Sequence, residues 1–464
     1  MLATGLLGAC IALFIPRGRA RLVGGVLAVG LLAVASMQRS LDGLEHSPLT
    51  APRDARAAAT ITATLVDDPD GAQYSAKVLA WVRRLDGRHA GSRTVLVTAG
   101  GDAASRLRLL ETGDEVELSG WLQPLSGYDT RLRWRHAVAR FDAVELLAFE
   151  PAGSPLHRSA NALRGRVLAG GRHLPATERA LLAGFLLGDT RALPRGTEEQ
   201  FRAAGLTHLL AVSGANVAFV LALTRPLLRR LSLRTQLVAG LGVLVVFGTM
   251  TRWEPSVLRA CAMAACSMTA LYLGRPTAGL RVLALAVVAL LLVDPFLLHS
   301  IGFLLSCGAS AGIVTLATRI AARLRGPSWL REPLGVTLAA QIGVAPVLIP
   351  VFGSIPLAAL PANLVAVPLA GPLTASGFVA GFGSAAVEPW WPGLAAALQA
   401  PVGLLATAML QVAAVFSRFP VEVDGRAALA IVAGAALVGA ARLWSTSASP
   451  PRRNLRSDAP IPSR

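Results

Sequence analysis

Residues 205–223, GLTHLLAVSGANVAFVLAL, form an apolar stretch long enough to cross a membrane as a helix. His208, Ser213, Gly214 and Asn216 interrupt its middle. Polar side chains at membrane depth cost free energy unless a partner or a water-filled cavity satisfies them, so the stretch predicts a functional site. The alternative is a packing helix, whose small residues let a neighbouring helix approach closely.

The rest of the chain divides into a polar part and an apolar part. Of its 464 residues 53% are hydrophobic, and nearly all the polarity lies between Asp42 and Phe201. From Gly205 onward, repeated apolar runs of about 17–25 residues indicate membrane helices. The sequence therefore predicts a polytopic α-helical membrane protein of about eleven spans with an inserted extracytoplasmic β-domain.

The net charge of +17 does not by itself indicate binding to nucleic acid. Arginines cluster at the ends of apolar runs, as expected of loops on the cytoplasmic side of a membrane. The sequence contains no CxxC motif, no metal-ligand spacing of Cys and His and no P-loop, so we predict no cofactor and no metal site. All four cysteines fall within predicted membrane segments: Cys10, Cys261, Cys266 and Cys307.

The amino-terminal half is predicted to contain two units. Residues 1–43 form a transmembrane hairpin whose arginine-rich turn lies in the cytoplasm, so the amino terminus and the next domain lie outside. Residues 44–150 follow as about five strands separated by turn signals such as Asp70-Gly71. This pattern suits a small barrel or sandwich, and an OB-like barrel is one candidate.

Aromatic residues of the β-domain are candidates for stacking on the bases of single-stranded DNA. Core or hairpin packing is the commoner role of such residues, and it remains the alternative here. The candidates are Trp81, Trp121, Tyr128 and Trp134.

The remaining chain is predicted to approach and then cross the membrane. Residues 151–204 read as amphipathic helices at the membrane interface. Residues 205–444 form the polytopic domain, within which the proline-rich run 354–384 predicts a broken or re-entrant segment lining a passage. Residues 445–464 are rich in Ser, Pro and Arg, which predicts a disordered cytoplasmic tail.

The spacing within the opening stretch argues against a nucleophilic Ser–His pair. Ser213 and Asn216 are three residues apart and share one helix face. His208 and Ser213 are five apart, which places them on different faces unless the Ser-Gly pair kinks the helix.

Further polar residues at membrane depth are candidates for a channel or substrate path. Arg259 needs a carboxylate or a wet cavity, and an ion pair that merely fixes two helices is the alternative. Gln341 and Asn363 can hydrogen-bond across helices without any role in transport. The full set is His208, Ser213, Gly214, Asn216, Glu254, Arg259, Asp294, Ser306, Gln341 and Asn363.

Five segments together resemble the ComEC family of competence proteins in order and spacing, over roughly residues 40–420. They are ERALLAGFLLGDT, GLTHLLAVSGANV, EPSVLRACAM, DPFLLHSIGFLLSC and PANLVAVPLAGP. The resemblance implies a channel that carries single-stranded DNA across the cytoplasmic membrane during natural transformation. It also implies an OB-like outer domain that meets DNA, competence machinery at the outer face and a DNA-handling motor in the cytoplasm.

The sequence departs from the family pattern at two points. Family members usually have His where this chain has Asn216. Many carry a carboxyl-terminal metallo-β-lactamase-like domain, and no HxHxD cluster occurs here, so we expect any nuclease activity to come from another chain or not to exist. Two other functions remain open: a transporter of another anion on the same fold, and a membrane enzyme using His208 with Ser213 or Asp294.

Overall fold

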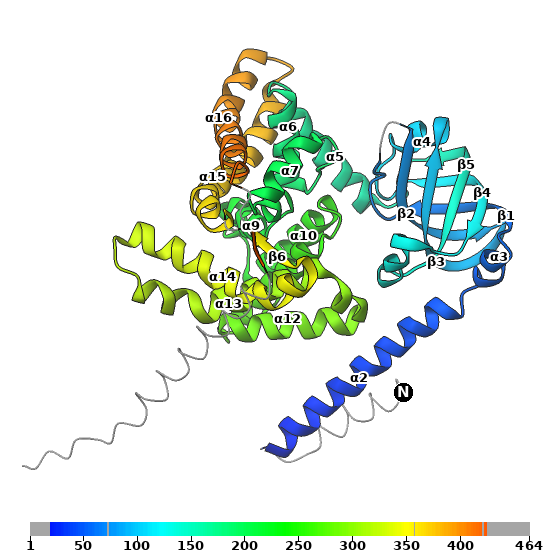
Figure 1. The fold of residues 1–464 in the computed structure, drawn as a ribbon, viewed down its shortest axis with the longest axis horizontal. Coiled ribbons are helices and arrows are strands. Elements are labelled where there is room, and N and C mark those ends of the chain that lie inside the picture. Colours follow the sequence, from blue (N-terminus) through cyan, green and yellow to red (C-terminus); the bar gives the residue numbers. More distant parts are fainter. Residues whose placement is uncertain (1–18, 72–73, 357, 420–421, 425–464) are drawn as a thin grey trace, which may run out of the picture.

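The computed structural model describes residues 19–71, 74–356, 358–419 and 422–424. Within these ranges a small barrel and a larger bundle of helices lie side by side, and the long helix α2 (Arg19–Glu45) runs away from the barrel (Figure 1). Residues 1–18 of the predicted hairpin, residues 425–444 of the predicted polytopic domain and the predicted tail lie outside the described residues.

The β-domain is a closed five-stranded barrel with the strand order β1-β2-β3-β5-β4. Neighbouring strands are antiparallel except β3 and β5, which run parallel. Alternating apolar residues point inward, as Val116 and Leu118 do on β4. The strands are β1 (Ala58–Leu65), β2 (Ser75–Leu85), β3 (Arg88–Gly100), β4 (Glu115–Gln123) and β5 (Ala137–Glu150).

Three short helices accompany the barrel. Helix α3 (Thr50–Asp54) joins α2 to β1, and α4 (Gly101–Leu107) follows β3. The 3₁₀ helix η1 (Gly127–Arg135) precedes β5 at the opposite end of β3, because the start of β5 pairs with Thr94.

The helical bundle contains six stretches long and apolar enough to cross a membrane within the described residues, which confirms a polytopic membrane domain. These are α8 with α9, and α10, α13, α14, α15 and α16. The helices are α5 (Pro155–Gly170), α6 (Ala176–Leu187), α7 (Arg195–Ala203), α8 (Thr207–Leu210), α9 (Gly214–Leu228), α10 (Leu233–Met250), α11 (Pro255–Tyr272), α12 (Gly279–Val293), η2 (Pro295–His299), α13 (Ile301–Arg323), α14 (Ser328–Phe352), α15 (Ala359–Val387) and α16 (Pro392–Phe416). Strands β6 (Ser354–Pro356) and β7 (Glu422–Asp424) pair with each other.

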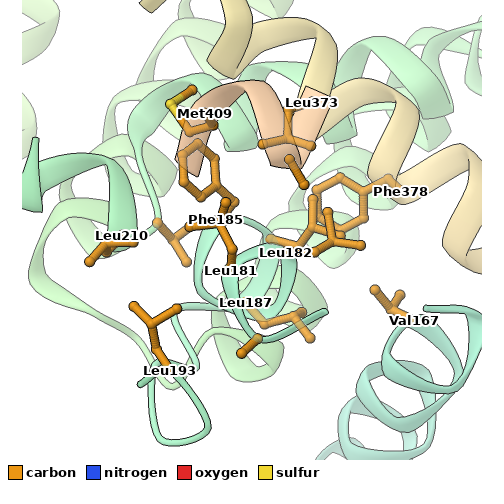
Figure 2. Close-up of a cluster of buried hydrophobic side chains, with 14 of the residues drawn as sticks. Val167, Leu181, Leu182, Phe185, Leu187, Leu193, Leu210, Leu373, Phe378 and Met409 are labelled. Carbon is orange, nitrogen blue, oxygen red and sulfur yellow. The ribbon is translucent and has the colours of Figure 1, made fainter. Parts of the chain in front are cut away.

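Helix α6 is buried inside the bundle, and the interfacial position of residues 151–204 stays a prediction. Every residue from Ala180 to Leu187 is buried. In Figure 2, side chains of α6 meet residues of α5, α8, α15 and α16, including Val167, Leu210, Phe378 and Met409. Because the run is apolar on all sides, it is stable only when neighbouring helices cover it completely.

Close helix contacts explain some of the glycines. A side chain at Gly308 of α13 would meet the backbone oxygen of Gly343 on α14 at 2.5 Å. Small residues at such positions let two membrane helices pack backbone to backbone.

The break predicted for the run 354–384 does not occur within residues 359–384. Helix α15 continues from Ala359 to Val387 with Pro368 and Pro372 inside it. It packs against α5, α6, α9 and α16, and such neighbours make a helix with internal prolines tolerable at membrane depth. The break occurs earlier, between α8 and α9.

Candidate substrate path at a broken membrane helix

The opening stretch is a broken helix. Helix α8 ends at Leu210 and α9 begins at Gly214, with Ala211 and Ser213 in extended backbone conformations between them. The backbone groups of Val212, which the break leaves without helical partners, are satisfied by residues at the start of α11. The N–H of Val212 donates to Glu254 Oε2 at 3.2 Å, and Ser256 Oγ donates to the Val212 carbonyl. Irregular backbone at membrane depth needs such partners.

Glu254 lies in the loop before α11 and is partly buried. Burial raises the pKa of its carboxyl to about 7, although the hydrogen bond from Val212 N–H acts in the opposite direction. Gly188 leaves room for this carboxyl, because a side chain there would lie 2.1 Å from Glu254 Oε1. Its backbone φ of +73° also favours glycine. Glu254 is therefore held between α6 and the break.

Asn216 and Ser213 are in contact, as their spacing predicts. Ser213 Oγ donates to Asn216 Oδ1 at 3.1 Å. Asn216 is buried, and its Nδ2 donates to the Phe185 carbonyl at 2.5 Å, which links α9 to α6. The Ser213 hydroxyl is thus bonded to the Asn216 amide, and Asn216 holds the start of α9 against α6.

Arg259 lies beside the start of α9. Its side chain is only 8% exposed, and its Nε donates to Ser306 Oγ on α13 at 2.6 Å. Its Nη2 lies 3.1 Å from the position that a side-chain carbon at Gly214 would occupy. Within the described part of the chain, no carboxylate lies within 4 Å of this guanidinium. Glu254, five residues before Arg259 in the sequence, therefore does not pair with it.

The site combines two sources of positive charge. The amino-terminal end of a helix carries a partial positive charge and free N–H groups, and α9 begins at Gly214. The Arg259 guanidinium adds a full charge next to it. Such a combination attracts anions such as phosphate.

His208 is exposed on α8, immediately before the break. Among the described residues, the structure brings Arg259 together with Gly214 and Ser306, and His208 stays a predicted path residue.

Three predicted path residues lie elsewhere. Asp294 caps η2 and accepts from His136 of the barrel at 3.1 Å, so it belongs to a contact between the two domains. Asn363 is buried and donates to the Ala359 carbonyl of its own helix, with its Oδ1 unpaired. Gln341 is half-buried on α14.

A pocket of about 190 Å³ lies between α9 and α15. Apolar residues line it, and none of the predicted path residues is among them: Phe219, Val220, Ala222, Leu223, Ala375, Phe378 and Val379. This lining suits hydrocarbon and offers nothing to a phosphate group.

The aromatic candidates of the barrel separate into two pairs. Trp81 on β2 and Trp121 on β4 are half-exposed on the outside of the barrel. Trp134 stacks on His299 of η2 with ring centroids 3.7 Å apart, so that face is closed to a nucleic-acid base. Tyr128 is exposed, with Arg131 over its ring.

The sequence reasoning missed a buried cluster of charges between barrel and bundle. Asp68, in the loop after β1, contacts Arg252 at 2.7 Å and Arg164 at 3.2 Å. Asp189 contacts Arg164 and Arg191, each at 2.7 Å. Asp189 directly follows the apolar run of α6, and that position was the available signal for a buried acid.

The two aspartates of this cluster are stabilised as carboxylates. Burial raises the pKa of Asp68, but Arg252 and Arg164 outweigh it and hold the pKa below its ordinary value. At Asp189, the hydrogen bond from Arg191 and the charge of Arg164 likewise overcome burial and lower the pKa. Arg252 adopts a φ of +57°, an uncommon conformation that its contacts in the cluster hold in place.

Within the ranges that the structure covers, no group of three His, Cys, Asp or Glu side chains is arranged to hold a metal ion.

The model of the competence family, described as competence protein, matches residues 185–447, more than half of the chain. The chain belongs to the competence family. The resemblance to its ComEC members is thereby confirmed, and the break, Glu254 and Arg259 all lie within the matched range.

Two curated relatives are similar to this family member over part of their length. Uncharacterized protein YcaI of Escherichia coli (strain K12) is 28% identical over 217 residues, which cover 42% of this chain and 28% of the relative. ComE operon protein 3 of Bacillus subtilis (strain 168) is 26% identical over 197 residues, covering 42% of this chain and 25% of the relative. The chain thus spans about a quarter of the length of these relatives. No solved structure matches.

Proposed function

We propose that this chain forms the path by which single-stranded DNA crosses the cytoplasmic membrane during natural transformation. Membership of the competence family and the similarity to ComE operon protein 3 support a role in DNA uptake. The observation that carries the finer proposal is Arg259, a buried guanidinium without a carboxylate partner in the described residues, placed at the break of a membrane helix.

The chemistry of the break suits a nucleic-acid backbone. A strand presents one negative phosphate per nucleotide, and a path for it must be electropositive and indifferent to base sequence. Arg259 and the amino-terminal N–H groups of α9 meet both conditions, because they recognise phosphate and ignore bases. Ser306 adds a polar group that accepts a hydrogen bond from the guanidinium.

The barrel is proposed to be an OB-like domain that meets incoming DNA. The strand order β1-β2-β3-β5-β4, with β3 and β5 parallel and α4 following β3, supports this proposal. Trp81 and Trp121 supply exposed aromatic surface on its outside.

Following the positive-inside rule, we place the barrel on the extracytoplasmic side and Arg319 with Arg323 on the cytoplasmic side, in a chain of about eleven spans. Other competence proteins, a cytoplasmic motor and a separate nuclease are its expected partners.

The experiment compares Arg259→Gln and Arg259→Lys with Arg275→Gln, which removes an exposed arginine between α11 and α12. We expect Arg259→Gln to reduce transformation by at least about tenfold, because one charge-assisted contact contributes about 1.5–3 kcal/mol. Arg259→Lys should retain part of the activity, and Arg275→Gln should behave like the unaltered chain. Protein level and DNA binding at the cell surface are measured in parallel.

Normal transformation by a well-expressed Arg259→Gln chain would contradict the proposal. If the same variant changed the flux of small anions instead, the anion-transporter alternative would be favoured. The enzyme alternative is weakened by the contacts of Ser213, whose hydroxyl is bonded to Asn216 and has no recorded contact with His208 in the described structure.

A further inference from the structure

The 3₁₀ helix η1 presents basic and aromatic groups on the outside of the barrel. The guanidinium carbon of Arg131 lies 3.0 Å from the ring centroid of Tyr128, and that of Arg133 lies 4.6 Å from the ring of Trp134. Tyr128 is 72% exposed, and both arginines are exposed. Such stacking keeps an arginine extended while leaving its N–H groups available.

Two charges of η1 are already paired, and two are not. Asp129 pairs with Lys77 at 3.7 Å, and Arg135 pairs with Asp67 at 2.8 Å. Arg131 and Arg133 have no carboxylate within 4 Å among the side chains that the structure describes. This end of the barrel therefore carries two exposed positive charges that no described carboxylate neutralises.

The position of η1 is fixed by contacts with the end of a membrane hairpin. Trp134 stacks on His299, and His136 contacts Asp294, so η1 is adjacent to η2, which connects α12 to α13. Apolar side chains remain exposed up to this connection: Val293 is 83% exposed and Leu298 is 51% exposed. In a membrane protein such side chains face hydrocarbon, and the headgroups lie just beyond them.

We infer that η1 binds anionic phospholipid headgroups at the membrane face where α12 ends, and thereby holds the barrel against the bilayer. Arg131 and Arg133 supply the charge that attracts an anionic surface, and Tyr128 supplies an amphipathic ring of the kind enriched at headgroup level. A nucleic-acid strand fits this segment less well, because one face of each aromatic ring is already covered, by Arg131 and by His299.

The test uses the full chain in nanodiscs of phosphatidylcholine alone or mixed with phosphatidylglycerol, and measures amide hydrogen exchange across residues 124–136. We expect exchange in this segment to slow several-fold in the anionic discs. Arg131→Gln combined with Arg133→Gln should abolish the difference between the two lipids. The matched control removes two exposed arginines near the opposite end of β3, Arg106→Gln with Arg108→Gln, and should keep the difference.

Equal exchange of residues 124–136 in both kinds of disc would overturn the inference. A single-stranded oligonucleotide is added to neutral discs as a further arm. Protection of η1 by the oligonucleotide, without protection by phosphatidylglycerol, would also overturn it and would assign the segment to nucleic acid. Because this readout needs no DNA uptake, it is independent of the proposed function.

Discussion

At the scale of single residues, Glu254 connects the break in the membrane helix to its surroundings. Its carboxyl accepts from Val212 N–H and lies against Gly188, in a partly buried position that disfavours the charged form. The pKa of the folded state is raised to about 7 from an ordinary value of 4.5. Between pH 4.5 and 7 the carboxyl ionises in the unfolded state before it ionises in the folded state. The free energy of unfolding therefore falls over this range and stays lowered above pH 7.

Replacing Glu254 by Gln should remove this penalty, because the amide oxygen can still accept from Val212 N–H. We expect Glu254→Gln to stabilise the protein above pH 8 by up to about 3 kcal/mol and to have little effect near pH 4. Thermal unfolding in detergent at several pH values measures this. Glu199→Gln, at an exposed position on α7, is the control and should leave the unfolding temperature unchanged at every pH. A Glu254→Gln chain less stable than the unaltered one at pH 8 would contradict the assignment.

Residue spacing predicts some of these contacts and not others. The contact between Ser213 and Asn216 was predicted from helical spacing, but it joins the extended residue before α9 to the third residue of that helix. The bond from Asn216 to the Phe185 carbonyl and the bond from Val212 to Glu254 join segments about thirty to forty residues apart in sequence. Such bonds depend on how helices pack, and no local pattern encodes them.

At the scale of elements, apolar periodicity and turn signals predicted the strands of the barrel and most of the long helices. The break was misplaced for a physical reason. Prolines in α15 suggested an interruption, but packed neighbours let the helix continue. Between α8 and α9 the interruption depends on Glu254 and Ser256, which offer the backbone alternative partners. The only local sign was the Ser-Gly pair within GLTHLLAVSGANV.

At the scale of the whole molecule, charges and aromatic rings join the barrel to the helical bundle. Asp68 reaches Arg164 and Arg252, while Trp134 and His136 reach η2. These contacts connect residues far apart in sequence, and the sequence offered only isolated charged residues near apolar runs. How much an ion pair contributes to stability depends on its burial, because exposed pairs contribute little.

Neighbouring aspartates allow a direct comparison of a buried and an exposed ion pair. Asp68→Asn leaves Arg164 and Arg252 short of countercharge and should destabilise the protein by about 3–5 kcal/mol. Asp67→Asn removes only the exposed pair with Arg135 and should cost about 1 kcal/mol or less. Thermal unfolding at pH 7 measures both. Equal loss of stability in the two variants would show that the cluster does not hold the domains together.

The central claim is that DNA passes the break between α8 and α9, and photocrosslinking during uptake tests it most directly. A photoreactive residue replaces His208 or Ala211, both exposed at the break, or Leu223, which lines the apolar pocket. Cells that still transform receive labelled DNA and are illuminated. We predict crosslinks to DNA from positions 208 and 211 and none from 223. Continued transformation without crosslinks at 208 and 211, or with equal crosslinks at 223, would contradict the claim.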